Sequence, residues 1–114
     1  MEEEILIKSW LVWRETHVHL QADKEVIVGS AVRFPSGYES MLQYLISGSS
    51  FMMNASYRKL RKQGILILGE YRERDEHFIM WRYRQQTRMV RMTFRELKGE
   101  MQQKMESLLI KAEL

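Results

Sequence analysis

The chain has 114 residues, a length that suits one globular domain and leaves no room for two hydrophobic cores. Hydrophobic residues make up 45% and charged residues 29%, which excludes a wholly disordered chain, and the net charge is +3. Because there is no cysteine, disulfides, thiolate metal sites and cysteine nucleophiles are excluded together. The acidic start, Met1–Glu4, is unlike a secretory signal, and no apolar run is long enough for a membrane span. We therefore expect a cytoplasmic protein with no membrane contact.

The first third of the chain predicts strands. Ile5–Arg14 has apolar side chains on both faces of an alternating pattern, so we expect a central or covered strand. A second strand region runs from about His17 to Phe34, and a turn near Ala22–Lys24 would make it a hairpin. Phe34–Gly37 reads Phe-Pro-Ser-Gly and predicts a turn, because proline fixes its own φ and glycine permits a positive φ.

Two short helices are expected in the middle of the chain. The apolar residues of Tyr38–Ile46 fall on one helical face, and Ser47–Ser50 then interrupts the pattern. Phe51–Gln63 predicts the second helix, because its basic last turns complement the helix dipole. Gly64 is a suitable residue to end it in a left-handed conformation.

The last half of the chain predicts three strands and a helix. The strands are Ile65–Arg72, His77–Arg84 and Thr87–Thr93, joined by short polar connections. Thr93-Phe94-Arg95-Glu96 matches a capping box and begins an amphipathic helix that runs to about Ala112. The sequence thus predicts a single α+β domain over residues 1–114. Its expected parts are an antiparallel sheet of four to six strands, two short central helices, and a C-terminal amphipathic helix packed on the sheet.

No catalytic, cofactor or metal motif stands out. The phosphate-binding glycine loops are absent, and no nucleophile-elbow pattern surrounds Ser47, Ser49 or Ser50. His17 and His19 would point the same way from a strand, but nothing fixes a third ligand. We therefore expect packed or solvated histidines, no enzyme activity, no cofactor and no metal.

Positive charge is concentrated in residues 55–98, where 12 Lys/Arg face 5 Asp/Glu, a net of +7. Arginine binds phosphate through forked hydrogen bonds, and aromatic rings stack on unpaired bases. Basic residues interleaved with aromatics on predicted strands therefore favour a small regulatory or accessory protein that binds nucleic acid. The alternative is that these arginines solvate a sheet while aromatics such as Trp81 fill the core. The candidate binding residues are Arg58, Lys59, Arg61, Lys62, Arg82, Arg84, Arg88 and Arg91.

The helices and hairpin predicted for residues 38–84 resemble part of a winged-helix module. Predicted strands stand where that family has its first helix. The resemblance implies that three residues face the major groove and two lie at the wing: Tyr57, Arg58 and Arg61, then Arg72 and Arg74.

A protein-binding adaptor or inhibitor remains the competing hypothesis. Of nine methionines, seven lie from Met52 onward, and methionine serves at surfaces that repack around partners as well as in cores. The arginine-rich strands suit an acidic protein partner. The C-terminal helix has enough apolar surface to dock on its own sheet or on a second copy, so a homodimer is included in this hypothesis.

Overall fold

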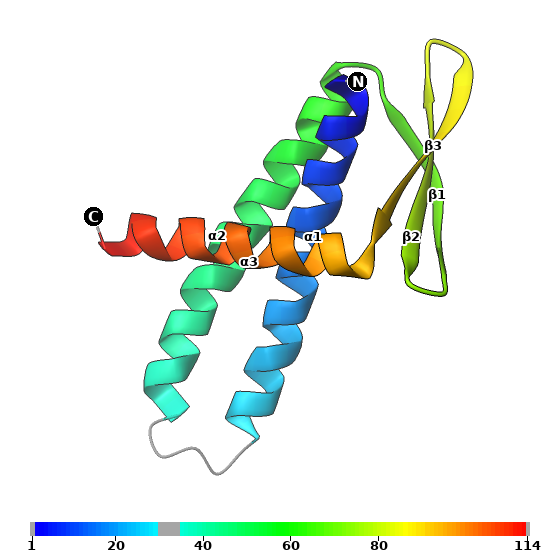
Figure 1. Cartoon of the computed structure of the whole chain (residues 1–114). Helices are drawn as coiled ribbons and strands as arrows, with labels where there is room; N and C mark the ends of the chain where they lie inside the picture. Colours follow the sequence, from blue (N-terminus) through cyan, green and yellow to red (C-terminus); the bar gives the residue numbers. More distant parts are fainter. Residues whose placement is uncertain (1, 30–34, 114) are drawn as a thin grey trace.

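A computed structural model of the chain describes residues 2–29 and 35–113 (Figure 1). This part is α+β, as predicted, with three helices and one antiparallel sheet of three strands, fewer than the four to six expected. The helices are α1 (Glu2–Val28), α2 (Pro35–Lys62) and α3 (Phe94–Glu113), and the strands are β1 (Leu66–Glu73), β2 (Glu76–Tyr83) and β3 (Gln86–Thr93).

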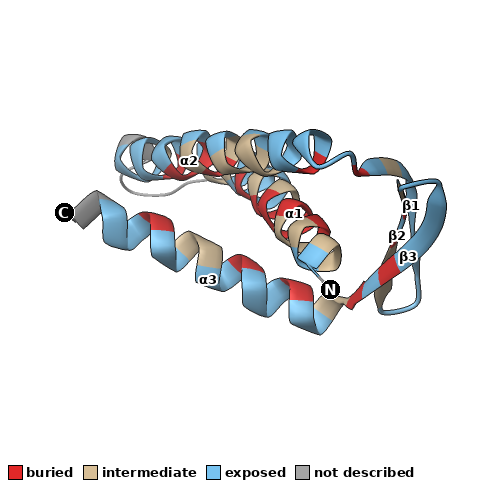
Figure 2. Cartoon of the chain, turned by 90° about the horizontal axis from the view of Figure 1, so that it is seen from above, coloured by how far each residue is buried: buried red, intermediate tan, exposed pale blue. Residues whose placement is uncertain are grey.

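Helix α1 replaces the predicted N-terminal strands. The strand assignments for Ile5–Arg14 and for the described part of the region from His17 to Phe34 are wrong, as is the turn at Ala22–Lys24. Residues 30–34 lie outside the described residues. Four consecutive residues, Trp10–Trp13, are buried, because α2, α3 and the sheet surround α1 on several sides (Figures 1 and 2). A helix buried this way shows no single apolar stripe, so its pattern is easily taken for a covered strand.

Helix α2 is one continuous helix where two short ones were expected. Ser47–Ser50 does not interrupt it, and two residues of this segment, Gly48 and Ser49, lie against neighbouring helices. Ser49 is fully buried, and its hydroxyl lies 3.2 Å from His17 Nδ1 of α1. Pro35 begins the helix, a position where the missing N–H of proline costs nothing. The part of the predicted Phe34–Gly37 turn that the structure describes is therefore helical.

The end of α2 agrees with the prediction. Gly64 has a φ of +80°, and its N–H donates to Arg61 O at 3.0 Å, while Ile65 N–H donates to Leu60 O at 2.9 Å. These two bonds form a Schellman motif, which satisfies the last carbonyls of the helix. They also turn the chain from α2 into the sheet.

The sheet has the strand order β1-β2-β3, and all pairs are antiparallel. The three strands match the predicted ranges to within a few residues, although Arg84 lies in the β2–β3 turn and not in β2. All helices lie on one side of the sheet (Figure 2). The side chains of Ile79, Trp81 and Val90 are buried on that inner face, and alternation directs their neighbours outward.

Helix α3 begins as the capping signal predicts, with Glu96 N–H donating to Thr93 Oγ1 at 3.1 Å. The expectation that this helix packs on the sheet is confirmed only for its first turns. Figure 1 shows α3 crossing α1 and α2, and only its first turns lie near β3. Leu97 and Met101 join the core that α1 shares with the sheet, whereas Leu108 packs in a second cluster between α1 and α2.

Candidate functional site

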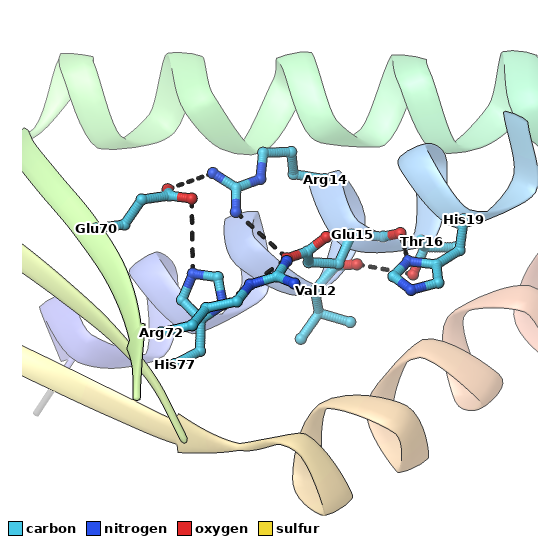
Figure 3. Close-up of polar contacts among 8 residues, drawn as sticks. All are labelled: Val12, Arg14, Glu15, Thr16, His19, Glu70, Arg72 and His77. Carbon is cyan, nitrogen blue, oxygen red and sulfur yellow. Dashed lines mark hydrogen bonds and ion pairs between the residues drawn. The ribbon is translucent and has the colours of Figure 1, made fainter. Parts of the chain in front are cut away.

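Five charged or titratable side chains meet between α1 and the inner face of the sheet (Figure 3): Arg14, Glu15, Glu70, Arg72 and His77. The Glu15 side chain is the centre of this cluster and is only 3% exposed. Its Oε1 accepts a hydrogen bond from Arg72 Nη2 at 2.6 Å and lies 3.5 Å from Arg14 Nη2. Arg14 also forms an ion pair with Glu70 of β1. These contacts tie α1 to the second half of β1.

His77 is the buried member of the cluster on β2, with 1% of its side chain exposed. Its Nδ1 lies 3.8 Å from Glu15 Oε1, and its Nε2 lies 3.6 Å from Glu70 Oε1. Both distances exceed those of ordinary hydrogen bonds, and neither ring nitrogen has a hydrogen-bond partner. Burial disfavours the charged ring and outweighs the two carboxylates, so the pKa of His77 lies below its usual range.

The Glu70 carboxylate shows the opposite balance. Burial alone would raise its pKa, but the hydrogen bond and charge of Arg14, with a smaller contribution from His77, hold the pKa below its usual range. A neutral imidazole beside carboxylates is suited in principle to proton transfer. However, a substrate would reach Glu15 and His77 only if the sheet separated from α1. We therefore interpret this cluster as a polar latch between helix and sheet.

Sequence reasoning missed this latch. Glu15 and His77 lie far apart in the chain, and nothing in a single sequence pairs them. One signal was present: His77, Ile79 and Trp81 alternate on one face of the predicted strand, so burial of Trp81 implies burial of His77. A buried histidine favours polar neighbours, and Glu15 of α1 lies 3.8 Å from its Nδ1.

The eight cations predicted to bind an anionic partner are all exposed, and seven of them gather at one end of the molecule. Leu66 pairs with Arg82, so the start of β1, just after α2, lies beside the end of β2. The C-terminal end of α2 and the β2–β3 turn therefore share this end (Figure 1). We call it the basic end, and it comprises Arg58, Lys59, Arg61, Lys62, Arg82, Arg84 and Arg88. The eighth residue, Arg91, lies apart from it, and its Nη1 is 3.5 Å from Glu76 Oε1.

The basic end carries seven exposed cations but is not uniformly positive. Within the described residues, none of the four cations of α2 forms an ion pair: Arg58, Lys59, Arg61 and Lys62. Carboxylates of the first turn of α1 are nearby, and Glu3 lines a pocket of about 290 Å³ together with Arg84 and Arg88. Glutamates in this position also complement the positive end of the α1 dipole.

The aromatic residues of the sheet divide between its two faces. Trp81 is 1% exposed and belongs to the core, so on this point the structural interpretation of the aromatics is correct. Tyr83 is half-buried, and the Arg84 guanidinium lies 5.0 Å from the centre of its ring. On the outer face, the rings of Tyr71 and Phe78 stack at 4.8 Å. Trp10 and Trp13 of α1 are also buried.

The winged-helix resemblance does not survive in the structure. One 28-residue helix stands where two short helices would have to cross, so no helix-turn-helix angle is formed over residues 35–62. The ring of Tyr57 packs 6.1 Å from that of Trp10, and Arg72 is bound to Glu15. Neither side chain is placed as the resemblance implied.

The two histidines of α1 do not form a metal site with their neighbours. Since they lie on a helix and not on a strand, His17 and His19 point in different directions. His17 Nδ1 lies 3.2 Å from Ile46 O, and His19 Nδ1 lies 2.8 Å from Glu15 O. Over residues 2–29 and 35–113, no group of three or more His, Asp or Glu side chains is placed to hold a metal ion.

The profile of a family described as YhjD protein matches residues 1–113. No curated protein and no solved structure matches the chain. None of the helices that the structure describes is long and apolar enough to cross a membrane.

Proposed function

The chain belongs to the YhjD protein family, and we propose that it is a small non-enzymatic regulatory or accessory protein that binds nucleic acid through its basic end. One observation carries the proposal. Two segments about twenty residues apart, the end of α2 and the β2–β3 hairpin, bring seven exposed cations to the same end of the molecule. Such a cluster attracts the phosphates of a nucleic acid, and binding releases the counterions that are condensed on them.

The chemistry of this end suits backbone contacts more than base readout. Arginine offers a planar fork for phosphate oxygens, and five of the seven residues are arginines at exposed positions of the hairpin and helix end. The carboxylates at the start of α1 repel phosphate, so we expect moderate affinity and a steep dependence on salt. Both effects argue for binding that is not sequence-specific.

The test is a titration of labelled single-stranded and double-stranded DNA and RNA at about 50 mM and 200 mM salt. We expect binding at the lower salt that weakens sharply at the higher. The double variant Arg61→Ala/Arg84→Ala should weaken binding and reduce the salt slope by about one per lost phosphate contact. The control is Lys98→Ala/Lys111→Ala, which removes the same charge from the exposed side of α3. Absence of binding at low salt, or equal effects of the two double variants, would refute the proposal.

A protein-binding adaptor or inhibitor is the second candidate function. It is favoured by the uncovered outer face of the sheet, which carries apolar and methionine side chains and no helix. Capture from a nuclease-treated lysate separates it from the first candidate. Recovery of one defined protein whose binding is lost in Met80→Glu would support the adaptor, and retention of every interaction in that variant would exclude this face.

A further inference from the structure

The outer face of the sheet is apolar, although no part of the described chain covers it. Strand pairing places five apolar side chains on this face: Leu66, Tyr71, Phe78, Met80 and Met89. They alternate with the buried residues of the inner face, and four of the five are 38–46% exposed. All the helices lie on the other side (Figure 2). Isolated exposed apolar residues are ordinary, but a contiguous group on one face of a sheet marks an interaction surface.

This face is held in a fixed shape by its own side chains. The Tyr71 and Phe78 rings are stacked, with an interplanar angle of 10°, and Tyr71 Oη lies 3.7 Å from Met89 Sδ. Three strands are therefore linked across their outer side before any partner binds. A surface ordered in advance loses little side-chain freedom on association, which favours binding.

The charges at the two ends of this face have opposite sign. Arg82 extends the outward row of β2 at the end next to the β2–β3 turn. At the other end, Glu73 of β1 lies opposite Glu76 of β2 in the strand register. Arg91 forms an ion pair with Glu76. Within the described residues, Glu73 has no ion-pair partner. The face thus runs from a cation through an apolar centre to a carboxylate.

A surface of this kind is complementary to itself. A two-fold axis lying between two such sheets, perpendicular to the strands, brings apolar centre to apolar centre and reverses the ends. We propose that a second copy of this chain docks on the outer face, sheet against sheet with the strands antiparallel. Arg82 of each copy then faces the end of the partner sheet that carries Glu73 and Glu76. Stacked sheets at about 10 Å leave room for this interdigitation.

The area of the outer face limits how strongly two copies of the chain can associate. Three strands of eight residues cover about 27 by 14 Å, which is roughly 400 Å² on each copy when the face is treated as a plane. Specific interfaces usually bury about 800 Å² on each partner, so this face supplies about half the usual area and fits a weak, transient contact. We therefore expect a weak dimer, and its formation does not depend on nucleic-acid binding.

Sedimentation velocity of the full chain, from about 1 to 500 µM, tests the proposal. We expect a monomer–dimer equilibrium that Met80→Glu weakens at least tenfold. Phe51→Glu is the matched control, because Phe51 is more exposed than Met80 but lies on α2. Thermal melts of both variants establish that they fold. If Met80→Glu does not fold, Met89→Lys replaces it in the same measurement. A monomer over the whole range, or a dimer that Phe51→Glu weakens as much as Met80→Glu, would overturn the proposal.

A charge exchange tests the antiparallel arrangement. Arg82→Glu and Glu73→Arg each place like charges opposite one another, so each should weaken the dimer several-fold. The double variant restores opposite charges across the interface and should recover the wild-type constant. Recovery supports the arrangement, and additive weakening in the double variant would overturn it.

Discussion

Gly48 of α2 lies directly beneath the Leu108 side chain of α3, so that a Cβ at position 48 would stand 3.0 Å from Leu108 Cδ2. The two helices meet here around a cluster that also contains Trp13 and Leu45. Tyr44 Oη donates a hydrogen bond to Leu108 O at 3.2 Å and fixes the same crossing. Contact between α3 and α2 therefore depends on a residue without a side chain.

Alanine substitutions at two helical glycines should separate propensity from packing. Gly99→Ala meets no atom within 4 Å, so it should raise the free energy of unfolding by about 1 kcal/mol through helix propensity alone. Gly48→Ala gains the same propensity but must displace a Leu108 methyl group, and should stabilise less or not at all. Gly48→Leu should destabilise by about 1–3 kcal/mol through overpacking. Urea unfolding monitored by circular dichroism measures all three, and an equal gain for both alanine variants would show that α3 does not pack here.

The Glu15 carboxylate should matter more to stability than any surface glutamate. In Glu15→Ala, Arg14 and Arg72 lose their shared partner and His77 loses a neighbouring charge, so we expect a loss of about 1–3 kcal/mol. The loss stays below that of a fully buried pair, because 55% of the Arg72 side chain is exposed and its charge can return to water. Glu25→Ala, on the exposed side of α1, should stay within about 0.5 kcal/mol of wild type. If both variants have the same chemical denaturation midpoint, the latch does not stabilise the fold.

Stability should fall as the pH is lowered from about 7 through 6. The pKa of His77 is depressed in the folded chain, so the unfolded chain, with a pKa near 6.5, takes up the proton first. Stability is therefore fully present above the unfolded pKa and declines below it, with a slope of at most about 1.4 kcal/mol per pH unit. Arg14 and Arg72 oppose the proton on the ring, while Glu15 and Glu70 favour it.

Two variants test whether His77 causes the slope of the free energy of unfolding against pH. His77→Gln should flatten the stability profile between pH 7 and 6, whereas His19→Gln, at an exposed position of α1, should leave the slope unchanged. The pKa of Glu70 is also depressed, so its contribution is lost only as the pH falls below about 4.5, outside this range. Free energies of unfolding at half-unit pH steps give the comparison, and a slope that survives His77→Gln would exclude His77 as its source.

The second half of the fold was open to prediction from sequence, and the first half was not. From Gly64 onward, strand alternation, short polar turns and the Thr93 cap are local signals. Each helix or strand there is determined by the residues that form it. In α1, by contrast, the partners of Trp10–Trp13 are α2, α3 and the sheet, so burial on several sides removed the helical period. Gly48 and Ser49 look like a break until the helices that they accommodate are known.

The candidate sites divide along the same line. The excess of positive charge in residues 55–98 can be counted in the sequence itself. Antiparallel pairing of β1 and β2 then brings seven of the eight predicted cations together. The latch of Glu15 and His77 and the apolar outer face both depend on which side of the sheet the helices cover. That choice is made by tertiary packing, so alternation alone could define the two faces of β2 but could not say which one is buried.

The β2–β3 turn holds two non-glycine residues in the left-handed region, with φ of 51° at Arg84 and 64° at Gln85. Positive φ at both central positions of a two-residue hairpin is typical of a type I′ turn, which favours Asn-Gly. Gln85→Gly should relieve the strain and raise the free energy of unfolding by about 1 kcal/mol. The control is Gln86→Gly, which lies in β3 outside the left-handed region and should lower stability by about 0.5–1 kcal/mol. Opposite signs for these neighbouring substitutions, measured by thermal and urea unfolding, would establish that the turn is strained. A loss of stability in Gln85→Gly would show instead that the glutamine side chain supports the turn at the basic end.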